Sequence, residues 1–520
     1  MDTKALRQKI LDLAIRGKLV PQDPNDEPAS VLLERIRAEK QQMVKDGKLK
    51  AKDIKNDTVI FKGDDNLHYE QFADGTVKCI DDEIPFELPD GWTWVRINTA
   101  CIVNPRNNID DNTEVSFVPM ANISEGYANS FVSDSRLWRN VKTGYTHFAE
   151  NDIGIAKISP CFENKKSVVF TGLINGYGAG TTELHIIRTI SGLIVPEYLL
   201  CFAKRNDFIL GGVQTFSGDV GQQRVTKDYI ANYLVSLPPL NEQKRIISAI
   251  KEAYYIIENI EKTKLGLIED IDKAKFKILD LAIRGKLVPQ DPNDEPASVL
   301  LERIRAEKEE LIKQGKIKRD KKESVIFKGD DNSYYQDLPN CWSVCKLCEI
   351  SYFERGITFP ASAKETVPTD RNIACARTAN VQDLFDISNL IYVDRSFMKD
   401  NPDKLLKVND IIVSTANSLE LVGKSCIVEK LLEKMTFGGF VTVVRGIGIN
   451  HKYIHMCLKN KFLKGEFSYK STQTTNIANI STKDLAETII YLPPLAEQER
   501  IVNAVETLFA QIDKIVEQIS

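Results

Sequence analysis

A long run of apolar residues at heptad spacing occupies the middle of the chain. From Ile246 to Leu281 these residues recur alternately four and three positions apart, and Lys264 is the one polar member. This period predicts a single helix over residues 241–284 that packs along one seam. A pair of prolines precedes the pattern and Gly285 follows it, as expected at the two ends of a helix.

A second copy of this seam is divided between the two ends of the sequence. We therefore expect the ends to supply two pieces of a second long helix. If the halves pack with pseudo-two-fold symmetry, the long helices run antiparallel, and a domain stands at each end of a rod that sets their spacing. The seam positions of this second copy are Ile501, Val505, Leu508, Ile512, Ile515 and Ile519, followed by Leu6, Ile10 and Leu13.

The whole chain is internally duplicated, which is the first feature to establish because it decides the fold. Residues 9–40 and 277–308 are identical, and the blocks VIFKGDDN and LPPL-x-EQ-x-R recur around them in the same order. The segments between these shared blocks diverge strongly. This pattern indicates a constant frame that carries two domains of the same fold and different specificity.

The divergent segments, residues 92–240 and 342–495, contain short apolar or alternating runs separated by Gly, Asn and Asp. Such runs predict strands joined by turns, and one helix is expected in each segment, over residues 196–206 and 452–461. The predicted fold class is therefore α+β, with two strand-rich domains separated by long coiled-coil-like helices.

The repeated segment that follows each seam is expected to be helical as well. SVLLERIRAEK predicts an amphipathic helix with Ser30 and Ser298 as candidate caps. The charged runs that continue to about residues 57 and 323 predict a second, solvated helix in each half.

Composition narrows the protein class. The 520 residues are 42% hydrophobic, carry a net charge of −4, and include no apolar run long enough to span a membrane. Ten cysteines are too few for a disulfide scaffold, so we expect a reduced, cytoplasmic protein. The acidic balance means that partners would supply part of the positive field if the chain binds nucleic acid.

The order LPPL-x-EQ-x-R, long heptad helix, AIRGKLVPQDPNDEPA resembles the specificity subunit of type I restriction-modification systems, and the resemblance covers essentially the whole chain. It implies two target-recognition domains, each reading one half of a bipartite, asymmetric double-stranded DNA site, and helices that act as a ruler. The chain is thereby divided into five parts. Residues 1–67 are an N-terminal repeated helical region, and residues 68–240 are recognition domain 1. Residues 241–335 are a central repeated region with the heptad helix, residues 336–495 are recognition domain 2, and residues 496–520 are a C-terminal heptad helix.

The resemblance also implies partners and cofactors. Two modification subunits would dock on the helices and methylate adenine N6 with S-adenosylmethionine. Restriction subunits with ATP-driven translocase and Mg²⁺-dependent nuclease activity would complete the complex. No cofactor is expected in this chain itself.

Catalytic patterns in the chain are weak. There is no Asn/Asp-Pro-Pro-aromatic motif of an amino-methyltransferase and no GxxxxGK[ST] phosphate loop. Asp152, Glu163 and Lys165 have the composition of a nuclease site, although the second half has no matching carboxylate–lysine pair. The glycine-rich residues 176–180 precede an expected strand, which favours a loop over a cofactor cradle.

Two clusters could in principle hold a metal ion. Cys341, Cys345 and Cys348 have no second ligand pair nearby, and the first half has no cysteine at the matching positions. His451 and His455 stand four apart on an expected helix without a metalloprotease motif. We expect neither a metal site nor a catalytic site.

Polar loops and cations are the candidates for DNA contact, because base edges are read by polar side chains and phosphates by Lys and Arg. An ordinary solvent-exposed role is the alternative for each. The rival functions are a self-contained nuclease or methyltransferase and a scaffold whose domains bind protein. The candidates are Gln222, Gln223, Arg224, Gln473, Thr474, Asn476, Asn122, Arg136, Arg139, Arg377, Asn380, Lys165, Lys166 and Lys424.

Overall fold

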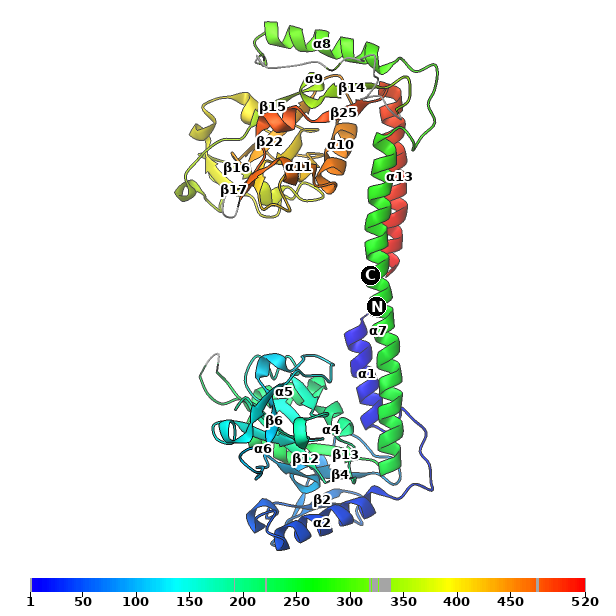
Figure 1. The fold of residues 1–520 in the computed structure, drawn as a ribbon, viewed down its shortest axis with the longest axis vertical. Helices are drawn as coiled ribbons and strands as arrows, with labels where there is room; N and C mark the ends of the chain where they lie inside the picture. Colours follow the sequence, from blue (N-terminus) through cyan, green and yellow to red (C-terminus); the bar gives the residue numbers. More distant parts are fainter. Residues whose placement is uncertain are drawn as a thin grey trace. The chain divides into compact units, whose positions relative to one another are not determined.

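A computed structural model describes residues 2–190, 192–219, 222–317, 319, 326, 338–473 and 477–519. The chain forms two compact units, Met1–Thr263 and Lys264–Ser520. Each unit contains one mixed α+β domain and the helices that flank it (Figure 1). The predicted fold class is thereby confirmed.

Two four-stranded sheets form the core of the first domain. One is antiparallel in the order β10-β9-β12-β5, and the other has the order β7-β6-β11-β8 with β11 parallel to β6. The strands are β5 (Cys101–Val103), β6 (Glu114–Val118), β7 (Asp134–Leu137), β8 (Thr146–Ala149), β9 (Ile153–Ala156), β10 (Ser167–Val169), β11 (Tyr177–Gly180) and β12 (Leu184–Thr189). Residues 177–180 are thus a strand themselves, and not the loop that their glycines predicted.

The second domain repeats this strand order with other residues, except that its second sheet, among the described residues, has no strand in the place of β8. Its sheets have the orders β15-β22-β18-β20 and β17-β16-β21, and β21 is again parallel to its neighbour β16. The two divergent segments therefore share one fold. The strands are β15 (Ser351–Arg355), β16 (Asn372–Ala376), β17 (Ile391–Asp394), β18 (Ile411–Ser414), β20 (Ser425–Ile427), β21 (Met435–Phe437) and β22 (Val441–Gly446).

Each domain contains more helix than the sequence predicted. The helix expected over residues 196–206 ends at Ala203. In each domain two further helices follow the expected one. They form because apolar residues turn inward from short segments that carry little periodicity; Phe208 and Phe467 are examples, both buried. The helices are α4 (Pro196–Ala203), α5 (Asn206–Gln214), α6 (Lys227–Asn232), α10 (His451–Leu463), α11 (Glu466–Lys470) and α12 (Thr482–Ala486).

Each domain begins and ends at the same place. The strand β4 (Thr93–Arg96) pairs antiparallel with β13 (Leu234–Leu237), so the chain enters the first domain beside the point where it leaves (Figure 1). In the second unit, β14 (Ser343–Lys346) pairs with β25 (Ile489–Leu492) in the same way. A divergent domain is thus attached to its constant frame through one pair of strands.

The heptad run forms the helix predicted from its period, α7 (Leu240–Ile283), which has 44 residues. In the first unit α1 (Thr3–Ile15) runs antiparallel to it, with Arg7 bound to Glu261 at 2.7 Å. In the second unit α13 (Leu495–Ile519) packs on the end of α7, and Lys275 binds Asp513 at 2.5 Å.

The seam differs from the predicted one at α1. Leu6 is 39% exposed, whereas Ile10, Leu11, Ala14 and Ile15 are buried. The first domain also packs on α1, so burial on this helix extends beyond the heptad positions.

The segments after the seams differ from the prediction in two respects. The helices α2 (Ala29–Lys45) and α8 (Ala297–Lys313) begin before Ser30 and Ser298, with a proline at each cap position and no side-chain cap. The first of the two predicted solvated helices is absent. Gly47 has a φ of +71°, which ends α2, and only a short turn, η1 (Ala51–Asp53), follows.

The corresponding run of the second half lies mostly outside the described residues. In the first unit a small antiparallel sheet comes after the charged run, which the sequence did not predict. Its strands are β1 (Val59–Lys62), β2 (His68–Gln71) and β3 (Val77–Cys79).

Candidate nucleic-acid interface

The polar residues of the repeated LPPL-x-EQ-x-R motif hold the frame together. Glu242 is only 1% exposed and accepts hydrogen bonds from the Trp92 indole at 3.0 Å and from the Gln22 side chain at 3.1 Å. The second unit repeats both bonds at Glu497. Burial raises the pKa of both carboxyl groups.

The next two polar residues of the motif fasten the domain to the frame. The Gln243 side chain donates to the Pro238 carbonyl at 3.0 Å and accepts from the Val195 amide at 2.9 Å, directly before α4. Arg245 binds Asp26 at 2.7 Å. Equivalent contacts recur in the second unit. The most recognisable residues of the sequence are therefore structural, and the candidates for DNA contact lie elsewhere.

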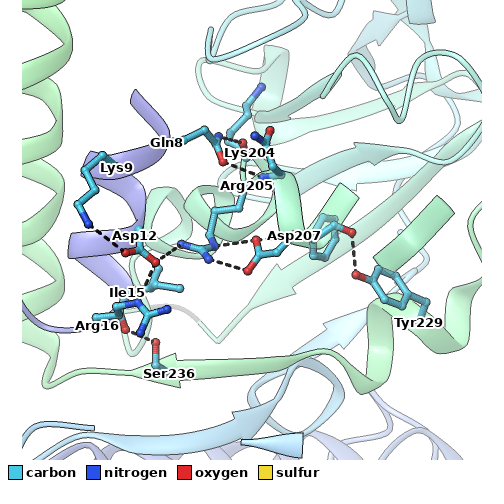
Figure 2. A network of polar contacts seen from close by, with 12 residues as sticks. Gln8, Lys9, Asp12, Ile15, Arg16, Lys204, Arg205, Asp207, Tyr229 and Ser236 are labelled. Atoms are coloured by element: carbon cyan, nitrogen blue, oxygen red, sulfur yellow. Dashed lines mark hydrogen bonds and ion pairs between the residues drawn. The ribbon is translucent and has the colours of Figure 1, made fainter. Parts of the chain in front are cut away.

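A further network joins α1 to the first domain (Figure 2). Arg205 pairs with Asp207 at 2.6 Å and with Asp12 of α1 at 3.4 Å. Gln8 donates to the Lys204 carbonyl at 2.8 Å and accepts from the Asn206 amide at 2.8 Å. These contacts involve residues of the divergent domain. The aspartate contact has a counterpart in the second unit, where Asp280 pairs with Lys464 at 2.7 Å, whereas Phe276 stands in place of Gln8.

The second domain contains a cationic pocket of about 490 Å³, which we call the second-unit pocket. Its walls come from the end of β15, the short turn η8 (Thr378–Asn380) and the link between β21 and β22. Arg355, Lys364 and Arg377 line it, together with Phe359 and Phe440, and none of its lining residues is acidic. Such a pocket favours an anionic ligand.

The first domain has a smaller cationic pocket, of about 330 Å³, which we call the first-unit pocket. Two of its walls correspond to walls of the second-unit pocket, because residues 104–106 follow β5 and Thr182 lies shortly before β12. Arg106 and Lys157 supply its positive charge, and its lining also lacks acidic residues.

Two histidines of the first-unit pocket are held by hydrogen bonds within the domain. His185 contacts the Val225 carbonyl at 3.1 Å through Nε2 and the Asn104 amide at 3.3 Å through Nδ1. His147 contacts the Lys142 carbonyl at 3.0 Å. Burial lowers the pKa of both histidines, so they are neutral at pH 7 and do not add to the positive charge.

The described ends of the two polar loops predicted to contact DNA are paired in equivalent ways. Ser217 pairs with Arg224 in the first domain, and β23 (Thr472–Gln473) pairs with β24 (Ala478–Asn479) in the second. Each hairpin also pairs with the segment that follows β9 or β18, through Ile158 in the first domain and through β19 (Ala416–Asn417) in the second.

The side chains on these hairpins differ in availability. Gln222 and Gln473 are exposed and Gln223 is half-buried. Arg224 makes a bidentate ion pair with Glu183, at 2.8 and 3.0 Å, beside the first-unit pocket. The candidates Thr474 and Asn476 lie outside the described residues.

The other candidates of the first domain are exposed or half-buried, and most contact the protein itself. Asn122 donates to the Val132 carbonyl at 3.1 Å, and Arg139 to Asn112 at 3.0 Å. Arg136 is exposed, and its guanidinium lies 3.5 Å from the centre of the Phe117 ring.

The lysine candidates likewise contact neighbouring groups. Lys165 donates to Asn206 at 2.5 Å, Lys166 to the Met120 carbonyl at 3.4 Å, and Lys424 to Gln382 at 2.8 Å. All three are partly exposed, so a DNA phosphate could replace these weak surface contacts.

Arg377 and Asn380 are three positions apart in the sequence, but Arg377 is half-buried and Asn380 is buried. Arg377 lines the second-unit pocket, and its Nε is buried without a hydrogen-bond partner among the described residues. Asn380 is fully buried and bonds the Arg377 amide and the Asp386 carbonyl, each at 2.8 Å. Asn380 therefore shapes the pocket wall and has no exposed atom to offer a base.

The nuclease-like trio does not form a site. Asp152 is buried in a bidentate ion pair with Arg188, at 2.7 and 2.8 Å, and accepts the Ala149 amide at 2.7 Å. Asp410 and Arg445 repeat this pair in the second domain at 2.8 Å. Glu163 is exposed, so the aspartate serves the fold in both domains.

The cysteine and histidine clusters also have structural surroundings. Cys345 and Cys348 are buried in the second unit, and Cys341 lies 4.0 Å from Glu497. His455 contacts the Ser425 carbonyl at 3.1 Å, and burial lowers its pKa to about 4. Among the described residues, no group of three or more His, Cys, Asp or Glu is placed to hold a metal ion.

The pocket residues Arg355, Lys364, Phe440, Arg106 and Lys157 were not singled out from the sequence. The sequence offers one signal for this group of residues: Phe440 follows two glycines, which places an aromatic side chain in a turn. Within the described ranges, no helix is both long and apolar enough to cross a membrane.

Comparison with known proteins gives a consistent result. Residues 89–270 and 339–520 each match the family described as type I restriction modification DNA specificity domain. The specificity subunits of type I restriction enzymes EcoEI and EcoAI, both from Escherichia coli, are each 35% identical to the chain over 98% of its length and 90% of theirs.

A chain of similar fold occurs in a solved structure whose subject is the complex assembly and conformational transition of the type I R-M system. Its TM-score is 0.56 at 20% identity, and the match covers 84% of this chain and 94% of that one. The duplicated frame, the two domains of one topology and these matches lead to one conclusion: the chain belongs to the family of type I restriction-modification specificity subunits.

Proposed function

We propose that this chain reads a bipartite, asymmetric DNA target, one half with each domain, and directs partner subunits to it. The observation that carries the proposal is the pair of domains with one topology and different polar surfaces, each attached to the same frame by the same buried contacts. An identical frame with divergent domains suits a protein that must present two different sequence readers in the same way.

The partners follow from the family. Modification subunits would methylate adenine N6 with S-adenosylmethionine, and restriction subunits would use ATP and Mg²⁺, while this chain supplies recognition and no catalytic group. All ten cysteines are free thiols, which suits a reducing cytoplasm. We expect the purified chain alone neither to cleave DNA with Mg²⁺ nor to methylate it with the methyl donor.

Domain exchange tests the proposal. Replacing residues 92–236 by the corresponding domain of another family member should change one half of the target, because β4 and β13 bring the two ends of the domain together. Methylation mapping of genomic DNA reads the target directly. The matched exchange of residues 342–491 should change the other half.

Two outcomes would contradict this proposal. A change in both half-sites, or in neither, would exclude modular reading. A change of protein partners with an unaltered DNA target would show instead that the domains are assembly surfaces.

A further inference from the structure

We propose that the second-unit pocket binds one unstacked nucleotide of the bound DNA, with the phosphate among its cations and the base against Phe440. The inference rests on the proposed function and assigns a specific ligand to one place on one domain. It is carried by the charge, the aromatic residues and the size of the pocket.

The cations are available for a phosphate. The Arg355 and Lys364 side chains are exposed and make no hydrogen bond or ion pair with the rest of the described chain. Arg377 donates to the Asn389 carbonyl at 3.1 Å from one terminal nitrogen, while its Nε is unpaired. Three cations in one pocket without a carboxylate repel one another, and an anion would relieve that repulsion.

The aromatic residues indicate a base beside the phosphate. Phe440 is 61% exposed at the pocket, although a side chain of this type is usually buried. A base can lie flat against an aromatic ring only where its own face is uncovered. In a duplex that requires the base step to open, which proteins achieve by inserting an apolar wedge or by turning a nucleotide outward.

The pocket has room for such a ligand. Its volume of about 490 Å³ falls within the range of roughly 300–1,000 Å³ typical of small-molecule sites. A glycine leaves space at one wall, because a Cβ atom at Gly439 would come within 3.3 Å of the Ile357 carbonyl oxygen.

The position of Phe440 relates it to the hairpin candidates. Its carbonyl accepts the Thr415 amide at 3.0 Å, and Thr415 is followed by β19, which pairs with the β23–β24 hairpin. The segment that carries Phe440 is therefore joined by a backbone hydrogen bond to the segment on which β24 pairs.

The first-unit pocket provides a contrast. Its cations Arg106 and Lys157 could also meet a phosphate, but its aromatic residue Tyr145 is half-buried and packs against Phe117 at 5.1 Å. We therefore expect base stacking in the second domain and phosphate contact alone in the first.

The test measures binding of the full chain, in complex with its modification subunits, to a duplex that carries its mapped target. The double variant Arg355→Gln, Lys364→Gln should reduce the slope of log affinity against log salt by about 0.9, the value for one lost phosphate contact. Phe440→Ala should weaken binding roughly five- to hundredfold without changing the slope. Lys430→Gln and Leu432→Ala, exposed residues of the same unit outside the pocket, are the matched controls.

A second readout follows the base itself. With 2-aminopurine placed in turn along the second half-site and its flanks, one position should show fluorescence that rises on binding and is lost in Phe440→Ala. If no position depends on Phe440, base stacking is wrong, and an unchanged salt slope in the double variant would exclude the phosphate contact. In either case the proposed function stands if the wild-type complex still binds and methylates its target. If the wild-type complex does not bind the target, the proposed function and the nucleotide pocket are both wrong.

Discussion

At the residue scale, the two domains keep the same buried ion pair while their surfaces diverge. Asp152 with Arg188 and Asp410 with Arg445 join the same two strands of each domain, β9 to β12 and β18 to β22. A charge buried in this way is tolerated only while its partner is present. This explains why an Asn-Asp-Ile sequence recurs within otherwise dissimilar segments.

The ion pair leads to a stability prediction. Asp410→Ala removes the closer of the two carboxylates beside the buried Arg445 guanidinium and leaves only Asp403, at 3.7 Å, which should cost about 3–5 kcal/mol. Asp383→Ala is the matched control, because Asp383 is 84% exposed and its pair with Lys459, at 3.6 Å, should contribute under about 1 kcal/mol. Differential scanning calorimetry should show a melting temperature lowered by roughly 6–20 °C for the first variant. Equal effects of the two substitutions would contradict the structural role of Asp410.

At the element scale, the two units hold their seam helices differently. α1 bonds the first domain through Gln8 and Asp12. The second repeat keeps the aspartate contact, with Asp280 bound to Lys464 at 2.7 Å, but has Phe276 in place of Gln8. The identical block begins at residue 9, directly after Gln8. The Gln8 contacts are thus the part of this junction that the second repeat lacks.

This junction can be tested by exchanging one residue. Gln8→Phe removes hydrogen bonds to Tyr127, the Lys204 carbonyl and the Asn206 amide, which together should contribute about 2 kcal/mol to the docking of α1. Amides of α1 should then exchange with solvent roughly thirtyfold faster. Lys9→Ala removes only an exposed contact with Asp12 at 3.9 Å and should change exchange by less than about twofold. Unchanged exchange in Gln8→Phe would show that the apolar seam alone holds α1.

At the scale of the whole molecule, α7 is the element that belongs to both units. The boundary between them falls at residues 263 and 264, and helical residues continue through it. The role of α7 as a ruler, and the meeting of the two chain ends, remain predictions from the duplication.

The ruler prediction concerns the length of the DNA spacer. Seven residues inserted between Leu265 and Gly266 add about 10.5 Å to a helix and turn it by only about 20°. At about 3.4 Å per base pair, the spacer between half-sites should lengthen by about three base pairs, or activity should be lost. A two-residue insertion turns the helix by about 200° and should abolish modification. Methylation mapping that shows an unaltered target in the heptad variant would contradict the ruler.

The sequence by itself determined the duplication, the α+β class, the course of α7 and the family, because these depend on periodicity and on repeated blocks. Only the tertiary structure decided which polar residues are free. Glu183 engages Arg224, and the Gln22 and Trp92 side chains engage Glu242, across 41 to 220 residues of sequence. The second-unit pocket likewise gathers Arg355, Lys364 and Arg377 from separate segments. A hydrogen bond or a shared electric field depends on distance in space, which no local pattern of residues specifies.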